Sequence, residues 1–203
     1  MNVLGILGSP SAVSRSASLL QLAQAHLQPV AGSCTILALR SLPAGPLLIG
    51  DVGDPVLGEA VASVEAADVV IVATPIYKAA YSGLLKLFLD LLPADALRGK
   101  AVLPLASGGT MAHLLALEYT LKPVLAALGA RHVLDAVYAC DAQLPRHEAL
   151  GYLPDAEIQQ RIALSLQTLV ERAEPQRERA DAARQSRELL ARAHAAAPSE
   201  EAS

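Results

Sequence analysis

Residues 3–18 read VLGILGSPSAVSRSAS, and two patterns that decide the fold meet in this stretch. The apolar run Val3–Leu7 has the continuity of a strand that is buried on both faces. It passes into a loop of glycine, serines and one arginine, which opens into an apolar-periodic segment. A helix N-terminus favours an anion, because its backbone N–H groups point outward and its dipole is positive there. The stretch predicts a phosphate-binding loop, although the same serines fit equally well as caps of the helix.

The rest of the chain repeats this alternation. Continuous apolar runs predict five strands: Val3–Leu7, Thr35–Leu39, Val69–Ala73, Ala101–Ala106 and Val133–Tyr138. Five helices are predicted: Ser16–Gln28, Val56–Ala67, Ser82–Leu92, Met111–Leu128 and about Pro154–Ala173. Strands that are apolar throughout indicate cover on both sides, so we predict an α/β fold, a three-layer sandwich around a five-stranded parallel sheet. The flavodoxin-like strand order 2-1-3-4-5 is expected, with ligands at the carboxyl ends of the strands.

Length and composition fit one domain with an appendage. The 203 residues are 53% hydrophobic and 18% charged, which is more apolar surface than one such domain needs, so we expect some of it to be buried between subunits. Residues 1–173 form the predicted domain. Residues 174–203, rich in Ala, Arg and Glu, are predicted to be a solvated helix or a mobile tail, and a docking role for them stays open.

Charge and hydropathy argue against several classes of protein. The net charge of −4 leaves no basic field for nucleic acid. No apolar run approaches the roughly 20 residues that span a bilayer, and the N-terminus lacks the basic region of a signal peptide, so no membrane role is expected. Cys34 and Cys140 lie far apart and the histidines share no metal-ligand spacing. We therefore expect reduced thiols, a cytoplasmic protein and no metal site.

Two further unusual loops follow predicted strands. Residues 74–83 read TPIYKAAYSG: Pro75 is expected to end the strand, and Tyr77 and Tyr81 form a shelf for an aromatic ring system. Tyr81 fits equally well as packing at a subunit interface. Residues 107–110 read SGGT, where paired glycines let the backbone approach a flat ligand closely and offer it N–H donors.

The predicted strand order brings the three loops together, because the carboxyl ends of strands one, three and four are adjacent in it. One loop offers phosphate chemistry, one an aromatic shelf and one backbone donors, a combination that describes an FMN pocket. The first loop lacks GxGxxG and GxxxxGK(S/T), which argues against a Rossmann dinucleotide site and a P-loop nucleotidase.

The runs GSPSAVSRSASLL, ATPIYKAAYSGLLKLFLDLLP and GKAVLPLASGGTMAHLLALEYTLKPVL resemble the NADPH-dependent FMN reductases of the flavodoxin-like superfamily. The resemblance covers about residues 1–140 and is nearest to the reductases of two-component alkanesulfonate monooxygenase systems. It implies that FMN and NADPH or NADH bind, and that a hydride passes from nicotinamide to FMN. Reduced FMN is then released to a partner monooxygenase. Because the hydride passes directly between the two cofactors, no catalytic side chain is expected.

The resemblance also assigns site residues. It implies that the FMN phosphate is held by Ser9, Arg15, Ser16 and Ser18, and that the isoalloxazine is lined by Pro75, Ile76 and Tyr77, with Lys78 near its edge. It implies that the polar side of the ring meets the backbone of Ser107, Gly108, Gly109 and Thr110. His113 fits a flavin neighbour or a polar contact at a helix start. Ser11 stands where the family often has arginine, which implies a loose grip on the phosphate.

Two helices carry further expectations. Pro123 inside the segment 111–128 predicts a distorted helix, and the resemblance places a π-bulge at Tyr119, on a subunit interface where Tyr119 and Tyr81 tune flavin transfer. The segment 82–92 is apolar nearly all round, apart from Lys86 and Asp90, which predicts a homodimer or homotetramer.

Three other functions stay open. The first is a quinone or azo reductase of the same fold that retains FMN, and the second is a flavodoxin-type electron carrier. Such carriers grip flavin between aromatic rings, and only 3% of this chain is aromatic. The third, a binding scaffold without chemistry, is disfavoured by the intact loops.

Overall fold

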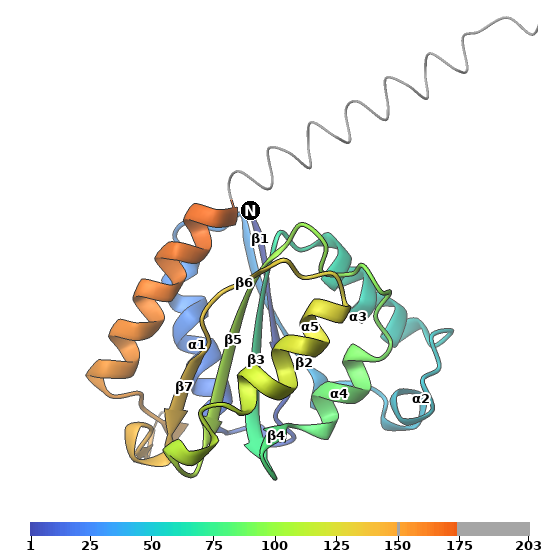
Figure 1. Cartoon of the computed structure of the whole chain (residues 1–203). Coiled ribbons are helices and arrows are strands. Elements are labelled where there is room, and N and C mark those ends of the chain that lie inside the picture. The colour runs from blue at the N-terminus through green and yellow to red at the C-terminus, as the bar shows by residue number, and fades with distance from the viewer. Residues whose placement is uncertain (150, 174–203) are drawn as a thin grey trace, which may run out of the picture.

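The structure is a computed structural model that describes residues 1–149 and 151–173 (Figure 1). The division predicted at residue 173 and the tail predicted for residues 174–203 lie outside what it describes.

A mostly parallel sheet forms the centre of the molecule. Its strands are β1 (Asn2–Leu7), β2 (Ser33–Ala38), β3 (Val69–Tyr77), β4 (Ala80–Tyr81), β5 (Ala101–Gly108), β6 (His132–Val133) and β7 (Val137–Cys140). The order is β2-β1-β3-β5-β6, with β4 antiparallel to β3 and β7 parallel to β5. The predicted α/β class is confirmed, but the predicted count of five strands is wrong.

The fifth predicted strand is split by one extra residue. Val133 of β6 is the partner of Val102, and Val137 of β7 is the partner of Leu105. The edge strand therefore advances four residues while β5 advances three. The N–H of Leu134 still donates to Val102 O (2.9 Å), so the bulge lies at residues 135–136.

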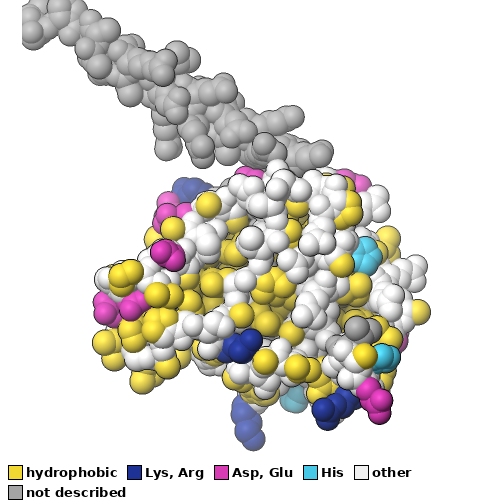
Figure 2. Space-filling model, turned by 180° about the vertical axis from the view of Figure 1, so that it is seen from behind, with side chains coloured by type: hydrophobic (Ala, Val, Ile, Leu, Met, Phe, Trp, Pro, Cys, Tyr) yellow, Lys and Arg dark blue, Asp and Glu magenta, His cyan; other side chains and the backbone are white. Residues whose placement is uncertain are grey.

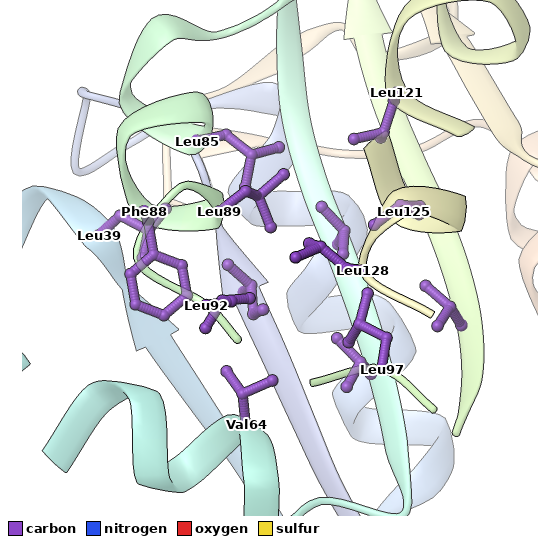
Figure 3. Packing of buried hydrophobic residues seen from close by; sticks show 14 of the residues in the cluster. Leu39, Val64, Leu85, Phe88, Leu89, Leu92, Leu97, Leu121, Leu125 and Leu128 are labelled. Atoms are coloured by element: carbon purple, nitrogen blue, oxygen red, sulfur yellow. The ribbon is translucent and has the colours of Figure 1, made fainter. Parts of the chain in front are cut away.

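Helices cover both faces of the sheet. They are α1 (Arg15–Leu27), α2 (Ala44–Ile49), α3 (Pro55–Ala66), α4 (Gly83–Leu89), α5 (Lys122–Ala127) and an unlabelled helix over residues 156–173, orange in Figure 1. Side chains alternate across the sheet: Val69 and Ile71 pack with α1 and the helix 156–173, whereas Val70 and Val72 pack with α3, α4 and α5. Figure 3 shows Leu85 and Leu89 of α4, Leu125 of α5 and Val64 of α3, all of which belong to this second layer of the core. The molecule is thus a three-layer sandwich.

The predicted helix 111–128 is three pieces. A 3₁₀ turn (Met111–His113) precedes a π-helix (Leu117–Leu121), in which the N–H of Lys122 donates to Leu117 O, five residues back. α5 follows directly, with Pro123 in its first turn, so Pro123 has no N–H to donate back into the π-helix. The predicted distortion and the π-bulge around Tyr119 are therefore present.

The expectation that Pro75 ends the third strand is wrong, since β3 continues to Tyr77. The N–H of Gly8 donates to Ala73 O (2.8 Å), so the backbone groups of residue 73, and of residue 75 two positions on, face β1. The ladder with β1 ends at the pair Leu7–Ala73. The N–H that proline lacks would face β1, but Pro75 lies beyond the last pair of that ladder. No hydrogen bond between β3 and β1 is therefore lost at Pro75.

Besides short 3₁₀ turns, three further elements were not predicted. These are α2, which packs against α4, and the antiparallel hairpin of β8 (Arg146–His147) and β9 (Gly151–Tyr152). In the described part of the chain, no helix has both the length and the hydropathy needed to cross a bilayer.

Candidate functional site

A pocket of about 270 Å³ lies at the carboxyl ends of β1, β3 and β5. The loops after these strands are called loop one (residues 8–16), loop two (74–83) and loop three (107–110). The pocket is lined by Ser9, Ser11, Val13, Ser14, Arg15, Ser16, Pro75, Ile76, Tyr77, Ser107, Gly108, Gly109, Asp141 and Tyr152. The three loops that the sequence singled out thus meet at one place.

Buried hydroxyl groups tie the three loops together. Ser16 Oγ and Ser107 Oγ lie 2.9 Å apart and link loop one to loop three. Ser82 Oγ donates to Gly8 O (2.5 Å), which links loop two to loop one. Within loop two, the N–H of Ser82 donates to Thr74 Oγ1 (3.0 Å). These buried hydrogen bonds hold the three loops together around the pocket.

The N-terminus of α1 lies at the pocket. Ser14 is the N-cap, and its Oγ accepts the N–H of Ala17 (3.1 Å). The residues that follow it, Arg15 and Ser16, both line the pocket at the positive end of the helix dipole. Ser9 is buried in the same loop, and its Oγ accepts the N–H of Ser11 (3.2 Å). The arrangement fits a phosphate group.

Arg15 has an unused donor in this pocket. Its Nε lies 3.2 Å from Asp141 Oδ1, which makes an ion pair, yet Nε is buried and has no partner in hydrogen-bond geometry. The guanidinium carbon lies 4.6 Å from the centre of the Tyr152 ring. A buried N–H without an acceptor is costly, and a phosphomonoester offers several acceptor oxygens.

Loop two is a strained hairpin turn. Tyr77 pairs with Ala80, and the two residues between them, Lys78 and Ala79, have φ of 51° and 63°. A two-residue turn with positive φ at both positions normally carries Asn or Gly, so these side chains cost about 1 kcal/mol each or more. The turn leaves the ring of Tyr77 half-exposed at the pocket rim, as a flat apolar surface.

Loop three keeps one face of its backbone open. Tyr138 is fully buried, and its hydroxyl donates to Thr110 O (2.6 Å). Burial, with smaller effects of Cys140 and Asp141, raises the pKa of Tyr138, so the phenol stays a neutral donor. A Cβ at Gly108 would collide with this hydroxyl, whereas a Cβ at Gly109 would have no atom within 4 Å.

Four of the predicted ligand contacts lie away from the pocket lining: Ser18, Lys78, Thr110 and His113. Ser18 Oγ donates to Ser14 O within the helix (3.4 Å), and Lys78 is exposed at the hairpin turn. Tyr81 is half-buried against the core, and Tyr119 is 76% exposed on the π-helix.

Five lining residues were not among the predicted ligand contacts: Ser11, Val13, Ser14, Asp141 and Tyr152. The first three belong to loop one, whereas the other two come from segments that the sequence analysis did not single out. Asp141 comes three residues after the predicted strand Val133–Tyr138 and directly after β7, so its place near a strand end was a usable signal. Tyr152 comes from the hairpin β8–β9, which has no sequence pattern of its own. The described residues include no group of three or more His, Cys, Asp or Glu that could hold a metal ion.

Known proteins resemble this chain in sequence and in structure. The sequence model of NADPH-dependent FMN reductases matches residues 1–144, which include all three loops and Asp141. FMN reductase (NADPH) of Escherichia coli (strain K12) is 45% identical over 169 residues, 83% of this chain and 87% of that protein. NADH-dependent FMN reductase SfnF of Pseudomonas putida is 30% identical over 151 residues, 72% and 81% of the two chains.

The fold is also similar to that of a solved structure of an FMN oxidoreductase. The apo form of NADH:FMN oxidoreductase (EMOB) has a TM-score of 0.75 and 41% sequence identity, and the match covers 83% of this chain and 87% of that one.

Proposed function

The chain belongs to the family of NADPH-dependent FMN reductases, and from this premise we propose that it reduces FMN with NAD(P)H in the pocket of loops one to three. One observation carries the proposal. The pocket joins an arginine and a helix N-terminus on one side to an aromatic surface and an open glycine backbone on the other. These are the chemistries of a phosphate and of a flat ring with polar edges.

Flavin and nicotinamide supply the reaction: a hydride leaves nicotinamide C4 and bonds to flavin N5, so that NAD(P)H loses two electrons and FMN gains them. The tasks of the chain are to bind, to orient and to exclude competing reactions. Loop one and Arg15 hold the phosphate. Pro75, Ile76 and Tyr77 support the ring, and Gly109 offers its backbone to the polar ring edge.

FMN is proposed to act as an exchangeable substrate. Ser11 is uncharged where the family resemblance led us to expect arginine, which leaves Arg15 as the single cation among the described lining residues. A weak grip suits a protein that hands reduced FMN to a separate flavin-dependent monooxygenase. We propose that this monooxygenase acts in alkanesulfonate desulfonation. The presence of the NADH-dependent FMN reductase SfnF among the relatives is consistent with a role in supplying reduced FMN to another enzyme.

A steady-state assay tests the proposal. Purified protein is assayed with NADPH and with NADH, each against FMN, FAD and riboflavin, by the loss of nicotinamide absorbance. We expect turnover well above buffer, with FMN preferred to riboflavin because only FMN carries the phosphate. The absence of turnover with every pair would refute the reductase, and equal rates with FMN and riboflavin would refute the phosphate role of loop one.

Flavin retention separates exchange from bound-flavin catalysis. A colourless protein after gel filtration from excess FMN is expected for exchange. A yellow protein with stoichiometric FMN that reduces quinones or azo dyes would instead indicate the bound-flavin reductases of this fold.

A further inference from the structure

Asp141 is the single acidic side chain among the described residues that line the pocket, and the proposed reaction does not use it. It begins a short turn (Asp141–Gln143) at the carboxyl end of β7. Gln143 Oε1 accepts the N–H of Cys140 (3.1 Å), which closes this turn on the strand. The carboxylate is therefore held on a fixed backbone, with Oδ1 3.2 Å from Arg15 Nε.

Tyr152 confines the same guanidinium from another direction, at 4.6 Å from its ring centre. The hairpin that carries Tyr152 lies close to loop one because residue 151 is glycine. Gly151 has a φ of +77°, and a Cβ there would lie only 2.6 Å from Val13 Cγ1. Arg15 is thus oriented by two side chains that come from beyond residue 140.

Resting on the proposed function, we infer that Asp141 weakens the hold on the FMN phosphate by competing with it for Arg15. The charges of the two side chains cancel within the pocket lining, which leaves the dipole of α1 as the remaining attraction for an incoming phosphomonoester dianion. It gains the guanidinium only as far as the carboxylate gives it up. Asp141 therefore tunes the pocket toward release of the flavin.

The substitution Asp141→Asn removes the charge and keeps the shape. We expect the Kd of FMN to fall about three- to tenfold, the range for one partly exposed charge, and the Kd of riboflavin to stay unchanged. Both are measured by titration calorimetry with oxidised flavin, so that no turnover is required. The gain for FMN shrinks as salt is raised, because the effect is a screened charge interaction.

Asp95→Asn is the matched control. It removes the carboxylate of another Arg–Asp pair, in which Arg98 Nε lies 3.7 Å from Asp95 Oδ2. This pair precedes β5 and so lies at the sheet edge opposite the pocket. The control carries the same change in net charge, and the Kd of both flavins is expected to stay at the wild-type value.

A second background tests whether the effect passes through Arg15. In Arg15→Gln, the additional change Asp141→Asn is expected to leave the Kd of FMN unchanged. Equal tightening in both backgrounds would mean that Asp141 repels the phosphate directly, and would overturn the competition. Unchanged or weaker FMN binding by Asp141→Asn alone would overturn the inference, as would a parallel change in riboflavin binding, which marks an altered pocket.

Failure of the inference and failure of the proposed function give different results. A wild-type protein that binds neither FMN nor riboflavin overturns both. A wild-type protein that binds and reduces FMN, with an Asp141→Asn variant of the same FMN-to-riboflavin preference, overturns the inference alone.

Discussion

Two adjacent glycines of loop three have different reasons to be glycine. A Cβ at Gly108 would collide with the Tyr138 hydroxyl, whereas a Cβ at Gly109 would meet nothing within 4 Å. We expect Gly108→Ala to lower the free energy of unfolding by about 1–3 kcal/mol through overpacking. Gly109→Ala leaves the unfolding midpoint in urea nearly unchanged and weakens flavin binding instead. In a double-mutant cycle, Tyr138→Phe should recover part of the Gly108→Ala loss; strict additivity would contradict the collision.

The Tyr138 hydroxyl makes the stability of loop three depend on pH. Burial, then Cys140 and Asp141, raise the pKa of Tyr138 above the ordinary 10.0. The unfolded chain therefore ionises first, and the contribution of the phenol is complete below about pH 10 and is lost as the pH rises through the folded pKa. The difference in unfolding free energy between wild type and Tyr138→Phe should stay constant from neutral pH to that point and then fall. Urea unfolding across this range measures it, and a difference independent of pH would contradict the burial argument.

At the scale of single residues, the sequence predicts the residues that line the pocket better than the hydrogen bonds and contacts that these residues make. Tyr77 ends the strand formed by a long apolar run, and Arg15 begins the helix that follows such a run, so their places at the carboxyl edge of the sheet were predictable. The bond between Ser16 and Ser107 depends on the register of β1 and β5 through β3, which no local pattern contains. Tyr152 depends on the close approach of Gly151 to Val13, a contact between distant parts of the chain.

The start of α4 joins a helix to loop one through one hydroxyl. Ser82 is buried, and its Oγ accepts the N–H of Leu85 (3.1 Å) while it donates to Gly8 O. Ser82→Ala removes a helix cap and leaves a buried carbonyl without its donor, so we expect a loss of about 2–3 kcal/mol in unfolding free energy. FMN binding is expected to weaken as well, because loop one loses its tie to loop two.

Asp54→Ala is the control for that prediction. Asp54 caps α3 by accepting from Val56 N and Leu57 N, and it lies outside the pocket lining. Its loss is expected to cost about 1 kcal/mol, the usual value for a cap, without changing the Kd of FMN. Equal losses of stability in the two variants would show that the bond from Ser82 to Gly8 adds nothing.

Elements with a long one-sided or two-sided apolar pattern were predictable, and short ones were not. The apolar runs of β1, β3 and β5 indicate strands of a parallel sheet, since strands that are buried on both faces are apolar throughout. α2 has six residues that include Gly45 and Pro46, and its helix depends on packing against α4. Pro123 revealed that the segment 111–128 is distorted, but its division into 3₁₀, π and α pieces is a matter of tertiary packing.

At the scale of the molecule, the exposed apolar surface that favours self-association lies beside the π-helix and not on α4. Leu85, Phe88 and Leu89 of α4 are buried within the subunit, partly because the unpredicted α2 packs against this helix. Exposed apolar side chains remain at Leu115 and Tyr119. Large apolar side chains left exposed beside one another favour burial against a second copy. Figure 2 shows the face opposite the view of Figure 1, where hydrophobic side chains are interspersed with polar and charged ones.

We therefore expect the protein to sediment as a homodimer or homotetramer, and Leu115→Glu to shift it to a smaller species. A charge buried in an apolar contact lacks a partner and opposes association. Leu164→Glu is the matched control, because Leu164 is a leucine of equal exposure on the helix 156–173, away from the π-helix. Sedimentation velocity at several concentrations measures all three proteins. A monomeric wild type would remove the basis for placing Tyr119 in an interface, and an unchanged Leu115→Glu variant would place the contact on another face.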